Sequence, residues 1–331
     1  MALYARLDKT AVEGLARRFG IGDITAFSVL DGGRENTSYC VETSSGKYVL
    51  TLWDQKSLKD ATNLASLLVY LTDHGIRTST VVVPPKEPVV VLHDEKPVML
   101  KRYVEGDVTA DLAGSILTQL GEEVARLHEI PAPSYLPKAF PYGRSHFPEV
   151  TNSNLGHNYM EWLSEKHRYL QKRIPQHLPM ALIHGDVFFD NMIVQDDQLM
   201  AIIDFEEACH YYRCFDLGMA IVGACRDSQG ISFEKAGRFI RAYQNKTTVQ
   251  LVECESLKAF TVYAAVATSF WRFRQYHLRR PEPQMYDKHV EMQTLADTIA
   301  EYPESCFTDL FTEQTTAATS GERARDSNVV G

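Results

Sequence analysis

The order of hydrophobic and polar residues predicts a helix and then several short strands in the first hundred residues. Residues 9–19 have apolar side chains at helical spacing and end at Gly20, a residue that commonly follows a helix. Short apolar or alternating segments divided by glycine-containing turns come next, which is typical of an antiparallel sheet. We expect strands at residues 27–30, 37–43, 48–53, 89–92 and 97–104, with a helix at residues 58–71.

Beyond residue 112 the pattern becomes helical. Helices are predicted at residues 117–127, 158–173, 217–225, 233–243 and 252–276, with an irregular segment at 133–152. A chain of 331 residues exceeds one ordinary hydrophobic core. We therefore predict an α+β protein with two lobes, in which residues 1–104 contain the sheet and residues 105–311 are mostly helical. The small, polar residues 312–331 are expected to be disordered.

Most of the candidate catalytic residues lie in the segment 182–207, which reads LIHGDVFFDNMIVQDDQLMAIIDFEE. His184, Asp186 and Asn191 have the spacing H-x-D-x-x-x-x-N, and Asp204 follows after a second apolar run. The apolar runs read as strands, so the polar groups stand at strand ends. Such an arrangement suits phosphoryl transfer, in which one carboxylate accepts the proton of a hydroxyl while an amide and a second carboxylate hold Mg²⁺.

A structural explanation competes with this one. Acidic residues at strand ends are common as turn residues and helix caps, and the H-x-D-x-x-x-x-N spacing alone is weak evidence. Here, however, I-I-D-F follows at hairpin distance, and Asp216 then begins an apolar segment that resembles a helix start. The joint pattern favours catalysis.

His184-Gly185-Asp186 and Ile203-Asp204-Phe205 resemble the motifs of the aminoglycoside phosphotransferase and choline kinase superfamily, whose fold is protein-kinase-like. The resemblance extends over roughly residues 27–301. It implies a two-lobed kinase that uses ATP and Mg²⁺, with Asp186 as catalytic base and Asn191 and Asp204 as metal ligands. It also implies that His184 braces the catalytic loop and that Asp216 binds backbone N–H groups of that loop.

The resemblance places the nucleotide in the N-terminal lobe. The turn at residues 31–36 is either a plain hairpin turn or a loop that covers the phosphates, in which case Gly32, Gly33 and Asn36 bind the nucleotide. The backbone of Arg102, Tyr103 and Val104 would bind the adenine as a hinge. One kinase feature is absent, because Thr51 stands where protein kinases have a lysine on the third strand. Lys56 and Lys101 are the candidate replacements.

Two stretches are similar to the bacterial homoserine kinase branch, namely G-R-E-N-T-S-Y from Gly33 and G-K-Y-V-L-T-L from Gly46. Homoserine, or a related amino alcohol, is therefore the first candidate for the hydroxyl substrate. Its carboxylate would need a cation and its ammonium an acid. The candidates are Arg34, Arg272 and Arg274 for the carboxylate, and Glu206 and Glu207 for the ammonium.

Other substrates stay open, because D-F-E at Asp204 resembles choline kinase-like members. The alternatives are a choline or ethanolamine kinase, a phosphotransferase acting on aminoglycoside or macrolide antibiotics, and a nucleotide-binding pseudokinase that serves as an interaction module.

Composition limits the classes of binding partner that we expect. A formal net charge of −9 argues against nonspecific nucleic-acid binding. The six cysteines lack metal-binding spacing, and we expect reduced thiols in a cytoplasmic protein. No signal peptide and no apolar run long enough to span a membrane is apparent. We therefore expect a small-molecule partner, with neither nucleic acid nor membrane, and the sequence does not indicate an oligomeric state.

Overall fold

The computed structural model describes residues 7–30, 36–153 and 158–311. Its N-terminal part is a five-stranded antiparallel sheet in the order β1-β2-β3-β5-β4. Side chains alternate between the two faces of each strand, so each face requires its own apolar cover. The strands are β1 (Ile24–Val29), β2 (Asn36–Thr43), β3 (Gly46–Trp53), β4 (Val91–His93) and β5 (Lys96–Arg102).

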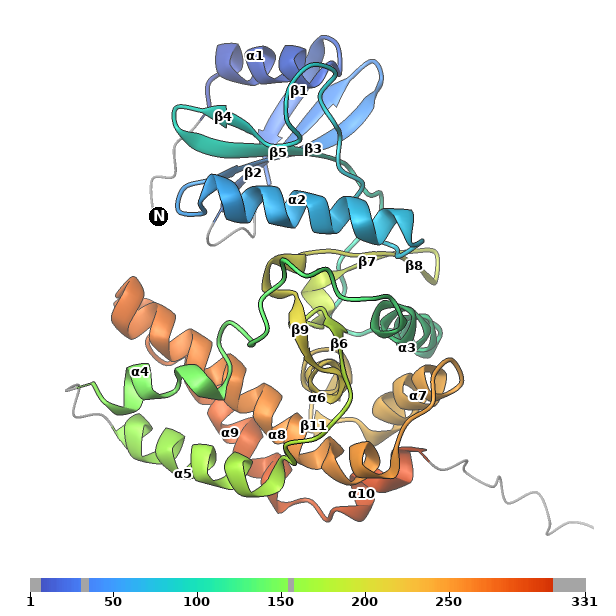
Figure 1. Cartoon of the computed structure of the whole chain (residues 1–331), viewed down its shortest axis with the longest axis vertical. Coiled ribbons are helices and arrows are strands. Elements are labelled where there is room, and N and C mark those ends of the chain that lie inside the picture. Colours follow the sequence, from blue (N-terminus) through green and yellow to red (C-terminus); the bar gives the residue numbers. More distant parts are fainter. Residues whose placement is uncertain (1–6, 31–35, 154–157, 312–331) are drawn as a thin grey trace, which may run out of the picture.

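Two helices cover the faces of this sheet. Figure 1 shows α1 (Lys9–Phe19) on one side of the strands and α2 (Leu58–Asp73) on the other. The buried side of α1 shares an apolar cluster with Leu50 and Leu100, whereas α2 packs in a separate cluster that contains Met99. Adjacent residues of β5 therefore face opposite sides, as a period of two requires.

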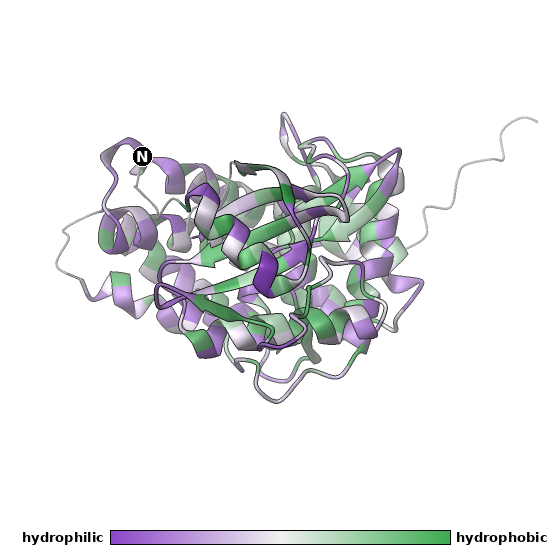
Figure 2. Cartoon of the chain, turned by 90° about the horizontal axis from the view of Figure 1, so that it is seen from above, coloured by the Kyte–Doolittle hydropathy of each residue, from purple (hydrophilic) through white to green (hydrophobic). Residues whose placement is uncertain are grey.

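The rest of the described chain is mostly helical and lies below α2 in Figure 1. Its long helix α8 is buried over most of its length and packs against α5, α6 and α9. Figure 2 shows hydrophobic residues concentrated near the centre and hydrophilic ones on the outer helices and loops. The helices are α3 (Gly114–Glu129), α4 (Pro148–Thr151), α5 (Asn158–Arg173), α6 (Arg213–Ala224), α7 (Phe233–Gln244), α8 (Leu251–Phe273), α9 (Lys288–Glu301) and α10 (Ser305–Thr308).

Two antiparallel strand pairs place the acidic motifs between the sheet and these helices (Figure 1). The strands are β6 (Met180–Ile183) with β9 (Cys209–Tyr212), and β7 (Met192–Gln195) with β8 (Gln198–Ile202). A small third pair joins β10 (Arg226–Asp227) to β11 (Gly230–Ile231). Helix α6 follows β9 directly and packs closely on α8. This close approach requires glycine at position 218, since a Cβ there would stand 2.5 Å from the Phe260 carbonyl oxygen.

The predicted fold class is confirmed: a five-stranded antiparallel sheet with helices precedes a mostly helical part. The helices predicted at residues 9–19 and 158–173 have the predicted bounds. The predicted strand 97–104 is wrong at its end, because β5 stops at Arg102. The predicted helix 252–276 is also wrong at its end, because from Arg274 the chain continues as a π-helix, η4 (Arg274–Arg279).

Three further expectations have different outcomes. The lobe boundary after residue 104 stays a prediction, and the predicted disordered tail at 312–331 lies outside the described residues. Over the described ranges, none of the helices combines the length and the apolar character needed to cross a bilayer.

Candidate active site

The catalytic loop after β6 is attached to the start of α6 through a buried carboxylate. Asp216 accepts hydrogen bonds from the backbone N–H of His184 at 2.7 Å and of Gly185 at 2.8 Å. Gly185 has φ of +85°, and a Cβ there would stand 2.9 Å from the Glu207 carbonyl oxygen. Only glycine fits this conformation and this space. Asp216 and Gly185 together set the position of Asp186.

His184 connects the two acidic motifs. Its Nδ1 accepts a hydrogen bond from the Asp186 N–H at 3.1 Å, and its Nε2 lies 2.9 Å from the Ile203 carbonyl oxygen. A ring that accepts at Nδ1 and donates from Nε2 is a neutral imidazole. Burial favours that state, because it lowers the pKa of His184 despite the charge of Asp216. The histidine therefore fixes the loop of Asp186 relative to the strand that precedes Asp204.

Asp186 is half-buried and is held by Asn191. The Asn191 side-chain N–H₂ donates to the Asp186 carbonyl oxygen at 2.9 Å and to its Oδ2 at 3.0 Å. Burial, and then the charges of Asp204 and Asp190, raise the pKa of Asp186 to about 7, while hydrogen bonds from Asn191 and Tyr142 oppose the increase. A carboxylate with a pKa near 7 is suited to take up a proton at neutral pH.

Asp204 begins the turn η3 (Phe205–Glu207) in an unusual conformation. Its φ of 65° and ψ of 62° lie in the left-handed region, which aspartate tolerates better than most residues. Its side chain is exposed to solvent, yet the surrounding protein and the charge of Glu206 raise its pKa. Because Asn191 uses its N–H₂ group on Asp186, its Oδ1 remains for a cation, and the Ile203 N–H bonds to the Asn191 carbonyl oxygen at 2.9 Å, which holds the residue before Asp204 against Asn191. Two oxygen donors of this kind fit Mg²⁺.

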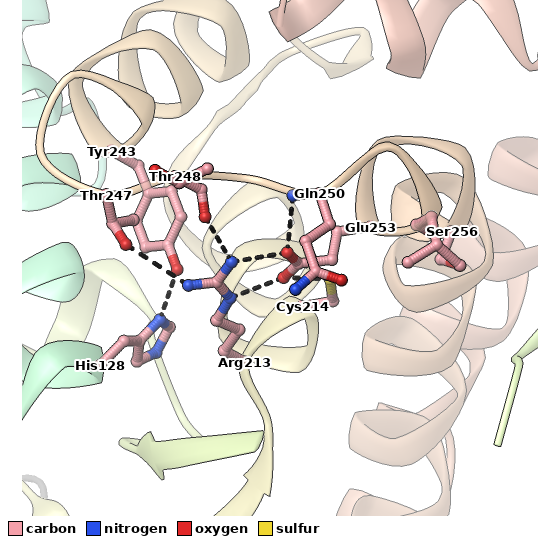
Figure 3. A network of polar contacts seen from close by, with 10 residues as sticks. His128, Arg213, Cys214, Tyr243, Thr247, Thr248, Gln250, Glu253 and Ser256 are labelled. Atoms are coloured by element: carbon pink, nitrogen blue, oxygen red, sulfur yellow. Dashed lines mark hydrogen bonds and ion pairs between the residues drawn. The ribbon is translucent and has the colours of Figure 1, made fainter. Parts of the chain in front are cut away.

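A polar network extends behind the catalytic loop. The His128 ring on α3 bridges Asp216 Oδ2, at 3.1 Å from its Nε2, and the Tyr243 hydroxyl, at 2.9 Å from its Nδ1. Figure 3 shows His128 and Tyr243 beside a second cluster centred on Arg213. In that cluster the Arg213 guanidinium binds Glu253 in bidentate fashion, at 2.6 and 2.5 Å. The network joins α3, α6, α7 and the start of α8 beneath the catalytic loop.

Glu206 links the turn after Asp204 to the N-terminal sheet. Its carboxylate accepts hydrogen bonds from Asn36 Nδ2 at 2.7 Å and Trp53 Nε1 at 3.0 Å, and it pairs with Lys56 Nζ at 3.0 Å. These donors stand at the start of β2, the end of β3 and just beyond β3. The carboxylate predicted to bind an ammonium group is therefore already occupied within the chain.

Comparison with known proteins agrees with this geometry. Residues 26–250 match the model of the phosphotransferase enzyme family. The chain belongs to that family. It is therefore an enzyme that transfers a phosphoryl group, and its kinase relatives identify the class as ATP-dependent transfer to an alcohol group.

This phosphotransferase has relatives of known name at low identity. It is 23% identical over 330 residues to the homoserine kinase of Nitrobacter hamburgensis, covering 91% of this chain and 97% of that protein. Two solved structures share the fold. A microcompartment-associated aminopropanol kinase has a TM-score of 0.69 at 17% identity and covers 92% of this chain and 100% of its own. A spectinomycin phosphotransferase with ADP and spectinomycin has a TM-score of 0.65 at 16% identity, covering 93% and 98%.

The phosphotransferase has a lysine near the position of the missing one. Thr51, where protein kinases have lysine, is buried and lies 3.2 Å from Ser38 through their hydroxyl oxygens. On the neighbouring strand β5, Lys101 is two residues beyond Met99 and faces the same side, toward α2. It makes no ion pair with any described residue, although it lies within the electrostatic range of Asp204 and Glu206. Burial lowers its pKa.

The predicted hinge is only partly available for a nucleotide. The Arg102 N–H binds the Thr80 carbonyl oxygen at 2.8 Å, and the Tyr103 N–H binds that of Lys47 at 3.0 Å. These two N–H groups are therefore engaged within the chain, and the prediction that backbone groups of Arg102 to Val104 bind the adenine stays a prediction. In the described part of the chain the Val104 N–H has no hydrogen bond, so Val104 stays a candidate.

The other residues predicted to bind substrate or nucleotide differ in whether they already have partners within the chain. Arg272 binds Glu291 at 2.9 Å, and Arg274 is buried and binds Glu149 at 3.2 Å, so both prior candidates for a substrate carboxylate have internal partners. Glu207 is half-buried near Tyr142 and Arg274. Gly32, Gly33 and Arg34 lie outside the described residues.

Sequence reasoning missed Tyr142 and the role of His128. Tyr142 belongs to an irregular segment without a motif, and His128, which the sequence suggests only as a packed helix-end residue, reaches Asp216 through the packing of distant segments.

Proposed function

We propose that the protein transfers the γ-phosphate of ATP to the hydroxyl of homoserine or a related amino alcohol, with Mg²⁺ as the metal. The observation that supports this proposal best is the shared hydrogen bonding of the two acidic motifs. His184 binds the backbone of both, and Asn191 holds the Asp186 carboxylate with its N–H₂ group, at 3.0 Å. These bonds support Asp186 as the base and Asn191 with Asp204 as the ligands of a cation.

The residues then have distinct tasks. Asp186 orients the substrate hydroxyl and accepts its proton as the oxygen attacks the γ-phosphorus. The bond from that phosphorus to the β–γ bridging oxygen breaks, and ADP leaves with the bond's electron pair. Asn191 and Asp204 would hold Mg²⁺, which, when bound, neutralises charge on the phosphate oxygens. The displacement is direct, because no residue beside Asp186 is a candidate for a phosphoenzyme.

Lys101 supplies the cation that the third strand lacks in this proposal. Lys56 is less suitable, because its ammonium is already paired with Glu206 at 3.0 Å. Lys101 has no such partner and faces the side of the sheet toward Asp204. Keeping an ammonium partly buried without a counter-ion is unfavourable, and perturbed groups of this kind concentrate at functional sites. A polyphosphate at Asp204 would provide the counter-charge.

Homoserine is preferred to the other acceptors on two grounds. The curated relatives at 22–25% identity are homoserine kinases that match over most of their length. The acids near the site, Glu206 above all, are engaged by internal partners, which disfavours a polycationic antibiotic. The aminopropanol kinase fold suggests the second candidate, a simple amino alcohol.

The test is ADP release with Mg-ATP and a panel of homoserine, threonine, aminopropanol, choline, ethanolamine and kanamycin. The Asp186→Asn variant should lose at least about 100-fold in kcat while it retains nucleotide binding. Asp196→Asn is the matched control, because this exposed residue lies in the turn between β7 and β8, outside the proposed machinery, and it should keep activity within about threefold. Near-normal turnover of Asp186→Asn would contradict the proposed base.

A further inference from the structure

A polar pocket lies beside the turn that carries Asp204. The proposed roles of the catalytic residues do not account for its cationic and amide side chains. Its volume is about 270 Å³. Two parts of the chain that are far apart in sequence form its wall. The lining residues are Asn36, Gln55 and Lys56 from the N-terminal part, and Gln275, Arg279 and Arg280 from the π-helix η4 after α8 and the residue that follows it.

The helical side of this pocket depends on the π-helix η4. The Arg280 N–H binds the Gln275 carbonyl oxygen at 2.8 Å, five residues back, which is the wide π pattern. The wider turn changes which side chains face the site. Arg274 is directed to Glu149 instead, and Gln275 and Arg279 reach the pocket. Single π-helical turns inside α-helices often occur at functional sites.

The charge of the pocket favours an anion. Of the six lining residues in the described part of the chain, three are cationic, three are amides and none is acidic. Lys56 is neutralised by Glu206, but Arg279 is exposed and makes no ion pair within the described ranges. Arg279 is also close enough to Arg274 to affect it electrostatically. The Arg279 guanidinium, which lines the pocket and has no acidic partner among the described residues, is therefore a favourable position for a carboxylate.

Gln275 gives a second, independent sign of a ligand. It is 8% exposed, yet it lines the pocket, and its side-chain amide makes no hydrogen bond with any described residue. The amide atoms are not sealed off from solvent, so they face the open space of the pocket and can bind a ligand there. An amide and a guanidinium that face one small cavity can together bind both oxygens of a carboxylate.

The pocket is next to the proposed transfer site. Asn36 and Lys56, two of its lining residues, both bind Glu206, which is two residues from Asp204. In Figure 1 the far end of α8 rises toward the sheet on the side away from β7 and β8. A ligand group bound in this pocket would therefore lie beside Asp204, the proposed metal ligand, and on the other side of the site from the predicted hinge after β5.

We propose that this pocket binds the carboxylate of the acceptor, so that the enzyme selects hydroxy amino acids over amino alcohols that lack a carboxylate. The inference rests on the proposed function and narrows it, because choline, ethanolamine and aminoglycosides offer no such group. The volume is also below the 300–1,000 Å³ that is usual for drug-sized ligands, which fits a small amino acid.

The experiment compares acceptors in matched pairs that differ by the carboxylate alone. The pairs are L-homoserine with 3-aminopropan-1-ol, L-threonine with 1-aminopropan-2-ol, and L-serine with ethanolamine. We measure kcat/KM for each member, and the Kd for Mg-ATP, in wild type and Arg279→Ala. Arg238→Ala is the control, because this arginine is exposed on α7 and its ion pair is with Glu234, four residues away on the same helix.

The expected result is that wild type prefers the acid of at least one pair and that Arg279→Ala lowers kcat/KM for that acid by about 10- to 100-fold. Values for the matching amine and for Mg-ATP should not change. An unchanged acid-to-amine ratio in the variant would overturn the proposal. A weaker Kd for Mg-ATP, with equal losses for both members, would assign the pocket to the nucleotide and overturn it as well.

Failure of the proposed function is recognisable separately. If no acceptor is phosphorylated, thermal shifts with L-homoserine and 3-aminopropan-1-ol still test the pocket. Stabilisation by the acid alone that is lost in Arg279→Ala would support it, and no stabilisation by the acid would overturn it. Turnover of the amines alone would overturn the pocket proposal while the enzyme remained a small-molecule kinase.

Discussion

Replacing Lys101 by methionine should change nucleotide affinity and stability in opposite directions. Methionine keeps most of the length and apolar surface of the lysine and removes the ammonium. A charge-assisted hydrogen bond to phosphate contributes about 1.5–3 kcal/mol, which corresponds to an increase of about 10- to 150-fold in the Kd for Mg-ATP. In the absence of nucleotide the same change removes a partly buried charge whose burial outweighs the attraction of Asp204 and Glu206, so the melting temperature should rise.

The pH dependence follows from the lowered pKa of Lys101. Between that pKa and the ordinary value for lysine, the folded chain binds fewer protons at this position than the unfolded chain does. The charged lysine therefore destabilises the fold below this interval, and the penalty disappears as the pH rises through it. The stability gained by Lys101→Met should accordingly be largest at neutral pH and smaller at alkaline pH.

Calorimetric titration with Mg-ATP and thermal denaturation at two pH values provide the measurements. Lys56→Met is the informative comparison, because it breaks an ion pair at 3.0 Å and should lower the melting temperature. If Lys101→Met left the Kd unchanged, or lowered the melting temperature as well, Lys101 would be a structural residue and the reasoning would be refuted.

Three more predictions concern the catalytic loop. Tyr142→Phe removes a hydrogen bond that lowers the pKa of Asp186, so the acid limb of the pH profile of kcat should move to higher pH. The profile is measured at saturating Mg-ATP for wild type and variant, and an unmoved limb would mean that the hydroxyl does not reach the carboxylate. Asp216→Ala leaves the His184 and Gly185 N–H groups without their acceptor, and denaturant unfolding should show a loss of at least about 2 kcal/mol, whereas an unchanged midpoint would exclude the bracing role. Asp204→Ala should weaken Mg-dependent ATP binding and turnover together, and normal Mg²⁺ dependence would show that the metal has other ligands.

The sequence predicted the parts of the site that lie close together along the chain. His184, Asp186, Asn191 and Asp204 fall within 21 positions, flanked by apolar runs that read as strands, and the hydrogen bonds expected from Asp216 are present. The fold class was equally accessible, because alternation in the first hundred residues and helical spacing afterwards are both strong patterns.

Contacts between distant segments were not accessible in the same way. Glu206 binds Asn36, which lies 170 residues earlier, and His128 reaches Asp216 only because α3 packs beside α6. Local patterns contain no information about such pairs. The surroundings of the arginines were inaccessible for a related reason. Helical spacing predicts a helix through residue 276, whereas Arg274 begins a π-helix and pairs with Glu149, and Arg279 lines the pocket.

The three bonds to Glu206 have a consequence for how the enzyme moves. All of its donors belong to the N-terminal part, while Glu206 itself stands two residues from Asp204 in the turn η3. A motion that separates the sheet from the helical part must break these bonds and release the turn that positions the metal ligand. Thermodynamic coupling is reciprocal, so occupation of Asp204 by a metal nucleotide should in turn favour the closed arrangement. We therefore expect separation of the sheet from the helical part to be coupled to nucleotide release through the bonds to Glu206.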